Sequence, residues 1–153
     1  MPPKPSIALL LACIGLAVSG CNPFEAEYIS ICETELMDRL KSPSGYKRIK
    51  VTQHTSKMTS DEWLAHREAR GYPAASSIEM DGLKNGTIRP LKNQAFIEYD
   101  APNSFGTLIR GTASCEYVSR EGSSLSPSTL DVLINGETNH ERIMKAVKRG
   151  LTD

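Results

Sequence analysis

The 153-residue sequence lacks most of the features that indicate a nucleic-acid-binding protein. Phe, Trp and Tyr make up 6% of the residues, and the formal net charge at pH 7 is zero because 18 basic residues balance 18 acidic ones. A neutral chain gives no electrostatic basis for binding nucleic acid or anionic lipid headgroups. No internal repeat is visible. The chain beyond its first segment, about 130 residues, is long enough for one domain with a hydrophobic core.

Catalytic and metal-binding motifs are also missing. The sequence contains no Gly-x-Ser-x-Gly turn, no glycine-rich phosphate loop and no cluster of paired acids. Its three histidines, His54, His66 and His140, lie in three different segments and do not have the spacing of metal ligands. We therefore expect no metal and no cofactor. A set of catalytic residues scattered along the chain stays open as an alternative.

The sequence has one long apolar run, from Ile7 to Val18. About a dozen residues suit the hydrophobic region of a signal peptide, and roughly 20 are needed to span a membrane. Lys4 precedes the run, and it ends in Val18-Ser19-Gly20-Cys21. This segment resembles the signal peptide of bacterial lipoproteins, whose lipobox is an aliphatic residue, two small residues and a cysteine.

The resemblance implies a signal peptide over residues 1–20 and a mature chain over 21–153, with lipid on Cys21 and a short tether after it. A diacylglycerol group on the thiol, often joined by an acyl chain such as palmitate on the new amine, anchors such proteins to the membrane. Asn22 stands where an aspartate would favour the inner membrane, so in a Gram-negative host we expect the outer membrane, facing the periplasm. An ordinary signal peptide or an uncleaved anchor is the alternative.

Two of the four cysteines are expected to pair. Cys13 leaves with the signal peptide and Cys21 carries lipid, which leaves Cys32 and Cys115 in an oxidising compartment where disulfides persist. Each falls on the apolar face of its predicted helix or strand. We therefore predict a Cys32–Cys115 disulfide, with two unpaired core thiols as the alternative.

The sequence predicts a single α+β domain in which a small antiparallel sheet of three or four strands packs against an N-terminal and a C-terminal helix. Helical spacing places Ile29, Cys32, Leu36 and Leu40 on one face of the first helix, which ends before Pro43. The C-terminal helix begins at the capping pair Thr138 and Glu141, and one side of it is lined by Ile143, Met144, Val147 and Leu151.

Alternating apolar residues predict strands near 45–53, 92–100, 107–118 and 129–136. The residues expected on one face are Ile49 and Val51 in the first, Ala95, Ile97 and Tyr99 in the second, and Ile109, Gly111, Ala113, Cys115 and Tyr117 in the third. A short helix is expected over 59–73, capped by Thr59 and Glu62 and ended by Gly71. Residues 72–91 are rich in small and turn residues, so we expect a long irregular connection there.

One segment invites a functional interpretation. The stretch from Tyr99 to Cys115 loosely resembles a pattern of small uncharacterised secreted bacterial domains, which brings no known activity with it. The matching residues are Cys32, Ser42, Pro43, Tyr99, Asp100, Ala101, Asn103, Phe105, Gly106, Arg110 and Cys115.

Two interpretations of this segment stay open. In the structural one, which we favour, Asn103 and Gly106 adopt positive φ in a turn and Arg110 pairs with Glu98 across a hairpin. In the functional one, Asp100, Asn103, Phe105 and Arg110 form a partner-binding loop.

The expected function is that of a membrane-anchored envelope lipoprotein, a non-enzymatic binding or structural module whose partner is another envelope protein or the cell wall. The alternative is an envelope hydrolase of unrecognised type. A polar pocket holding a histidine or carboxylate with a shifted pKa would favour the hydrolase, and an exposed apolar patch would favour the binding module.

Overall fold

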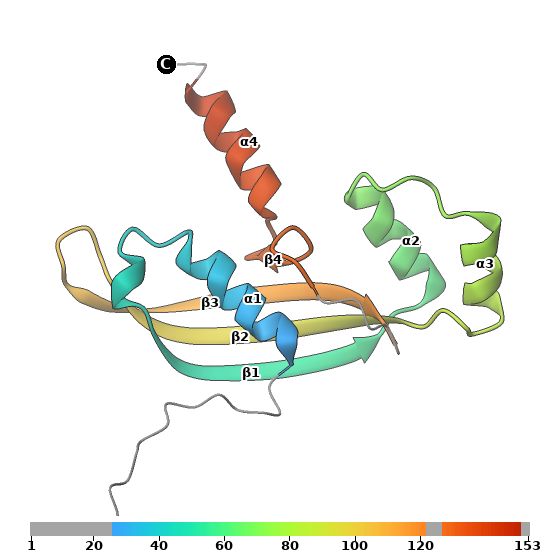
Figure 1. Cartoon of the computed structure of the whole chain (residues 1–153), viewed down its shortest axis with the longest axis horizontal. Coiled ribbons are helices and arrows are strands. Elements are labelled where there is room, and N and C mark those ends of the chain that lie inside the picture. The colour runs from blue at the N-terminus through green and yellow to red at the C-terminus, as the bar shows by residue number, and fades with distance from the viewer. Residues whose placement is uncertain (1–25, 122–126, 151–153) are drawn as a thin grey trace, which may run out of the picture.

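The computed structural model describes residues 26–121 and 127–150, so the predicted signal peptide and Cys21 lie outside the described residues. The elements in chain order are α1 (Glu27–Met37), the 3-10 turn η1 (Pro43–Gly45), β1 (Lys47–Lys57), α2 (Ser60–Ala69), α3 (Ser77–Lys84), β2 (Pro90–Pro102), β3 (Leu108–Arg120), β4 (Leu133–Ile134) and α4 (Asn139–Gly150). The strands form one antiparallel sheet in the order β1-β2-β3-β4, which confirms the predicted α+β class (Figure 1). Within the described ranges, no helix has both the length and the apolar character needed to cross a membrane.

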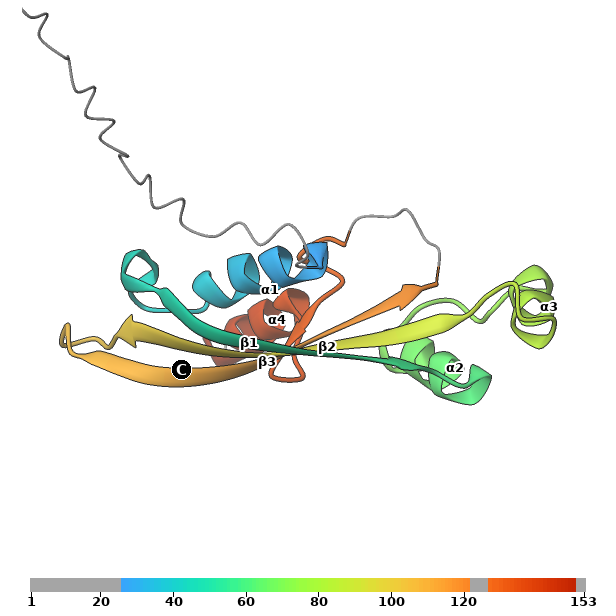
Figure 2. The ribbon, with the colours of Figure 1, turned by 90° about the horizontal axis from the view of Figure 1, so that it is seen from below.

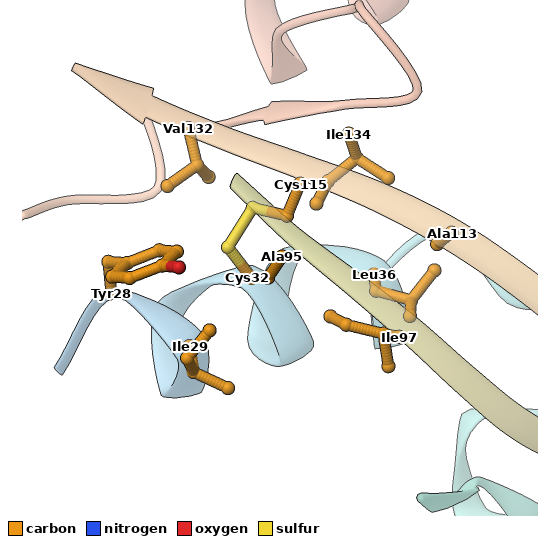
Figure 3. Close-up of a cluster of buried hydrophobic side chains, with 10 residues drawn as sticks. All are labelled: Tyr28, Ile29, Cys32, Leu36, Ala95, Ile97, Ala113, Cys115, Val132 and Ile134. Carbon is orange, nitrogen blue, oxygen red and sulfur yellow. A yellow bond between two sulfur atoms is a disulfide. The ribbon is translucent and has the colours of Figure 1, made fainter. Parts of the chain in front are cut away.

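The hydrophobic core lies between α1 and the sheet. Figure 2 shows α1 along one face of the sheet, with α2 and α3 at the end of the sheet away from the β2–β3 turn. The buried cluster, drawn in Figure 3, consists of Tyr28, Ile29, Cys32, Leu36, Ala95, Ile97, Ala113, Cys115, Val132 and Ile134. The apolar faces predicted for α1, β2 and the centre of β3 therefore meet as expected, except at Leu40. The helix ends at Met37, so Leu40 lies beyond it and outside the core.

The expected disulfide joins α1 to β3. Cys32 and Cys115 are bonded, their Cα atoms are 6.0 Å apart, and both side chains are buried within the core (Figure 3). The bond ties the helix to the middle of the sheet, because Cys115 pairs with Ala95 of β2 on one side and with Ile134 of β4 on the other.

The predicted face of the first strand is wrong at Ile49. The register with β2 shifts between Arg48 and Lys50, so Ile49 is the extra residue of a bulge and its side chain is exposed. Val51 still packs against the core. Arg48 takes the place expected for Ile49 and donates from Nε to a carboxylate oxygen of Glu33 on α1, at 2.7 Å. A bulge of this kind reverses the face of the sheet to which each side chain beyond it points. The alternation of apolar and polar residues does not predict this reversal.

Residues 72–91 are not the irregular connection that we expected. They contain α3, whose N-cap Ser76 and Glu79 form a capping box in the same way that Thr59 and Glu62 cap α2. The predicted end of α2 is confirmed, since Gly71 adopts a φ of 68° directly after the helix.

The strand predicted over 129–136 is much shorter than expected. Only Leu133 and Ile134 pair with β3, because Asp131 accepts hydrogen bonds from the backbone and side chain of Ser128 and holds the preceding residues in a turn. Asn135 and Gly136, with φ of 53° and 78°, then end β4 as predicted.

The C-terminal helix forms with its predicted cap, since Thr138 and Glu141 exchange backbone and side-chain hydrogen bonds. The expected packing of its apolar side on the sheet is not seen, because no described residue of α4 is buried. Ile143, Met144 and Val147 are 50%, 43% and 48% exposed, and Leu151 lies outside the described residues. Figure 1 shows α4 extending away from the β4 edge of the sheet.

Candidate functional site

The turn between β2 and β3 is closed by hydrogen bonds to one residue. The side-chain oxygen of Asn103 accepts from the backbone N–H groups of Phe105 and Thr107, at 2.9 and 3.0 Å. The backbone N–H of Asn103 donates to Thr107, and Gly106 donates to Asn103. Of the two residues expected at positive φ, only Gly106 is found there, at 79°. Asn103 therefore acts through its side chain, and the turn has little freedom to rearrange.

The hairpin presents apolar side chains to solvent. Phe105, at the turn, is 92% exposed, and Leu108 and Ile109 at the start of β3 are also exposed. We call these three residues the hairpin tip. Leu108 and Ile109 are consecutive residues of β3, so their side chains point to opposite faces of the sheet, and the hairpin presents apolar side chains on both faces and at its turn. Three exposed apolar residues within five positions are more than the single scattered ones that are ordinary on a protein surface.

An ion cluster fixes the strands behind the hairpin tip. Arg110 lies directly opposite Asp100 in the register and donates to both carboxylate oxygens, from Nε at 2.9 Å and from Nη2 at 3.1 Å. The expected pair with Glu98 is also present, diagonally, at 3.3 Å. These hydrogen bonds from Arg110 lower the pKa of Asp100. The cluster is exposed, so its contribution to stability is small, and its effect is to hold Asp100 and Arg110 in one arrangement.

A shallow apolar cleft of about 320 Å³ adjoins the hairpin tip. Leu40, Tyr99, Ala101 and Ile109 contribute to its walls, and Lys41 closes one side by donating from Nζ to the hydroxyl of Ser104 at 3.1 Å. Gly111 also lines the cleft, and the Tyr99 ring occupies the space beside it. A Cβ at that position would lie 2.6 Å from the Tyr99 ring, so only glycine lets the ring lie flat against β3.

A second cleft lies between α2 and the end of β3. It measures about 330 Å³, and its lining includes Trp63, His66, Arg70, Arg120 and Asp131. Burial, and then the nearby charge of Arg70, lower the pKa of His66. Two arginines beside Trp63, Arg67 and Arg120, form ion pairs with Glu79 of α3. The sequence does not predict this cleft, because it does not predict α3.

The second cleft has the feature that would favour the hydrolase, a polar hollow holding a histidine with a shifted pKa. Catalysis of acyl transfer also needs a nucleophile hydrogen-bonded to the base and a third group that orients it. Within residues 26–121 and 127–150, no side chain forms a hydrogen bond with His66. The same residues contain no group of three or more His, Cys, Asp or Glu that could hold a metal ion.

The structure brings together the four residues proposed for a partner-binding loop. Asp100, Asn103, Phe105 and Arg110 all belong to one hairpin, the first and last as a paired rung and the middle two in the turn. The exposure of Ile109 differs from the prediction, which places Ile109 on the buried face of the strand, whereas Leu108 lies on the opposite face and is exposed in agreement with the alternation. Ile109 lines the cleft instead, because the core side chains of β3 begin only at Ala113.

Comparison with known protein families, with curated proteins and with solved structures found no match for this chain.

Proposed function

We propose that this protein is a lipid-anchored lipoprotein of the bacterial envelope, and that its hairpin tip binds another envelope protein without catalysis. The observation that carries the binding role is the near-complete exposure of Phe105 on a turn whose backbone is held by Asn103. A bulky apolar side chain in solvent gains free energy when a partner covers it, by about 1.5–3 kcal/mol for a phenylalanine that becomes fully buried.

The rigidity of the hairpin strengthens this proposal. Binding costs free energy when loops and side chains must be ordered, and a preorganised surface avoids most of that cost. The hairpin is ordered before any partner binds, by the hydrogen bonds of Asn103 and by the bidentate ion pair of Arg110 with Asp100. The cleft beside Ile109 provides room for an apolar side chain of the partner.

The anchoring role is supported by the lipobox-like sequence before Cys21 and by the cysteine usage of the remaining chain. A disulfide between Cys32 and Cys115 suits an oxidising compartment such as the periplasm. In that compartment, lipid on Cys21 would hold the domain beside partners in the same membrane and raise their effective concentration.

Lipid attachment is tested on the full chain expressed in a Gram-negative bacterium and extracted from its membranes with detergent. We expect mass spectrometry to find a mature chain that begins at Cys21 and carries a diacylglycerol group. Cys21→Ser should leave the precursor uncleaved and unmodified. A mature chain that begins elsewhere, or an unmodified Cys21, would show that the anchoring proposal is wrong.

Partner binding is tested by crosslinking in intact cells followed by affinity purification of the full chain. We expect Phe105→Ser to reduce the recovery of crosslinked envelope proteins about tenfold or more, as for a central aromatic residue of an interface. The matched control is Ile78→Ser, since Ile78 on α3 is 81% exposed and α3 lies at the end of the sheet away from the β2–β3 turn (Figure 2). Equal recovery with Phe105→Ser, or an equal loss with Ile78→Ser, would contradict the proposed surface.

The envelope hydrolase is the second candidate function, and one observation favours it. His66 lies in a polar cleft, and its lowered pKa favours the neutral imidazole, which is the form that can accept a proton. If the protein is a hydrolase of this kind, His66→Gln should abolish an activity on envelope polymers while Phe105→Ser leaves it intact. The opposite pattern of losses favours the binding module.

A further inference from the structure

The C-terminal helix has two chemically different sides. At 3.6 residues per turn, Ile143, Val147 and Met144 fall within about 100° of one another, and His140 falls among them at the start of the helix. The opposite side carries the basic residues Arg142, Lys145, Lys148 and Arg149. This division into an apolar and a cationic side is typical of a helix that lies in the interface of a bilayer.

The charge of α4 differs from that of the whole chain. The helix contains four basic residues and one acidic residue, Glu141. Glu137, just before the helix, pairs with Lys145 at 2.5 Å. Counted over residues 137–153, which also include Asp153, four basic residues stand against three acidic ones. The zero net charge of the full sequence does not reveal this local excess of positive charge. An anionic surface would attract α4 more than the rest of the molecule.

A hollow beside the first turn of α4 adds further exposed side chains to this end of the molecule. His140 and Glu141 border this hollow of about 520 Å³, which is also lined by Tyr72 and Leu130, and both of these side chains are exposed. The amphipathic ring of a tyrosine is suited to the headgroup region of a membrane. Exposed apolar and aromatic side chains therefore lie beside the first turn of α4, in addition to those on the helix itself.

We propose that α4 lies on an anionic phospholipid bilayer, with Ile143, Met144 and Val147 in the acyl-chain boundary and its basic residues among the headgroups. The proposal does not depend on the hairpin tip or on lipid at Cys21. Together with such a lipid, it would give the protein two separate membrane contacts. A second copy of the chain is a weaker occupant of the same apolar side, because two helices with this charge repel each other when they pair.

The test places a reporter on α4 of the full chain. Val147→Trp adds an exposed indole, and the chain's own tryptophan, Trp63, is buried and gives a constant background. We expect vesicles of phosphatidylglycerol and phosphatidylcholine to shift the added fluorescence to shorter wavelength and to protect it from acrylamide. Vesicles of phosphatidylcholine alone should do neither. Because the signal comes from α4, binding through the N-terminal segment does not produce it.

Charge variants give the matched comparison. In the Val147→Trp background, Lys148→Gln with Arg149→Gln should weaken partition into the anionic vesicles about 30-fold, since each basic residue near such a surface contributes about a factor of five. Lys50→Gln with Lys57→Gln removes the same charge from β1 and should change nothing. Circular dichroism of each variant verifies that the fold is retained.

Three results would overturn the proposal. One is an added indole that stays quenchable by acrylamide with every vesicle. Another is an equal shift with anionic and neutral vesicles. The third is a shift without vesicles that grows with protein concentration, which would assign the apolar side of α4 to a second copy of the chain.

Discussion

Replacing Cys32 and Cys115 together with alanine is expected to lower the free energy of unfolding by roughly 4 kcal/mol. The disulfide closes a loop over a sequence separation of 83, and chain-entropy estimates for so long a loop are about 4 kcal/mol. A domain of this size has a total stability of about 5–15 kcal/mol, so the loss is a large share of it. The melting temperature should fall by more than about 10 °C.

Thermal and urea unfolding followed by circular dichroism, with the wild-type protein in its oxidised form, measure this effect. Alanine avoids the buried hydroxyls that serine would introduce, so the alanine pair isolates the effect of the bond. Each single replacement should destabilise similarly and also leave one thiol that pairs wrongly between molecules. The disulfide would be refuted as a stabilising bond if the double variant lost less than about 1 kcal/mol, or if both native thiols reacted with a maleimide without reductant.

The success of the sequence prediction follows the periodicity of the core residues. Ile29, Cys32 and Leu36 recur at helical spacing, and Ala95 and Ile97 alternate, because each set packs against the other and no position in either set is free to be polar. Where core packing requires an apolar residue, the spacing of these residues in the sequence predicts the helix or strand. The capping boxes of α2 and α4 are also predictable from sequence, because the cap residue and its partner lie only three positions apart.

Most failures of the prediction arise where a single residue changes the geometry or where the contact is long-range. The helix α3 is a different failure, because the cap of Ser76 and Glu79 is a local signal, but it lies in a segment rich in small and turn residues. One inserted residue at Ile49 reverses the faces of β1, and composition does not reveal it. The turn held by Asp131 shortens β4, although the residues of that segment alternate as a strand would. The turn pattern predicts Phe105 of the hairpin tip, but it does not predict that Ile109 is exposed, because that depends on the core side chains of β3 beginning only at Ala113.

Another feature beyond the reach of the sequence is a buried acidic residue on α1. Glu35 is 0% exposed and lies beside the apolar face that the helical spacing predicts. Its Oε1 accepts from Arg39 Nε at 3.0 Å, and its Oε2 has no hydrogen-bond partner within the described residues. The same guanidinium donates to the carbonyl oxygens of Ile134 and Glu137, each at 3.0 Å. Arg39 thus links α1 to the turn that follows β4, across 95 and 98 positions of sequence.

Arg39→Ala is therefore expected to lower the free energy of unfolding by about 3–5 kcal/mol, the usual cost of removing one partner of a buried ion pair. The loss has two sources, a buried Glu35 carboxylate without its donor and two backbone carbonyls of the β4 turn left without theirs. Urea unfolding measures it. The matched control is Arg89→Ala, because Arg89 also pairs with a glutamate, Glu121 at 2.9 Å, but at an exposed site.

The control should lose at most about 1 kcal/mol, as exposed ion pairs do. A further variant separates the two sources of the loss. Combining Glu35→Met with Arg39→Met removes the buried charge together with its partner and replaces both with flexible apolar side chains, so it should be more stable than Arg39→Ala alone. If Arg39→Ala and Arg89→Ala cost the same, Arg39 does not join α1 to the β4 turn in solution. If the double methionine variant is no better than Arg39→Ala, the loss comes from the carbonyls of Ile134 and Glu137 rather than from the unpaired carboxylate.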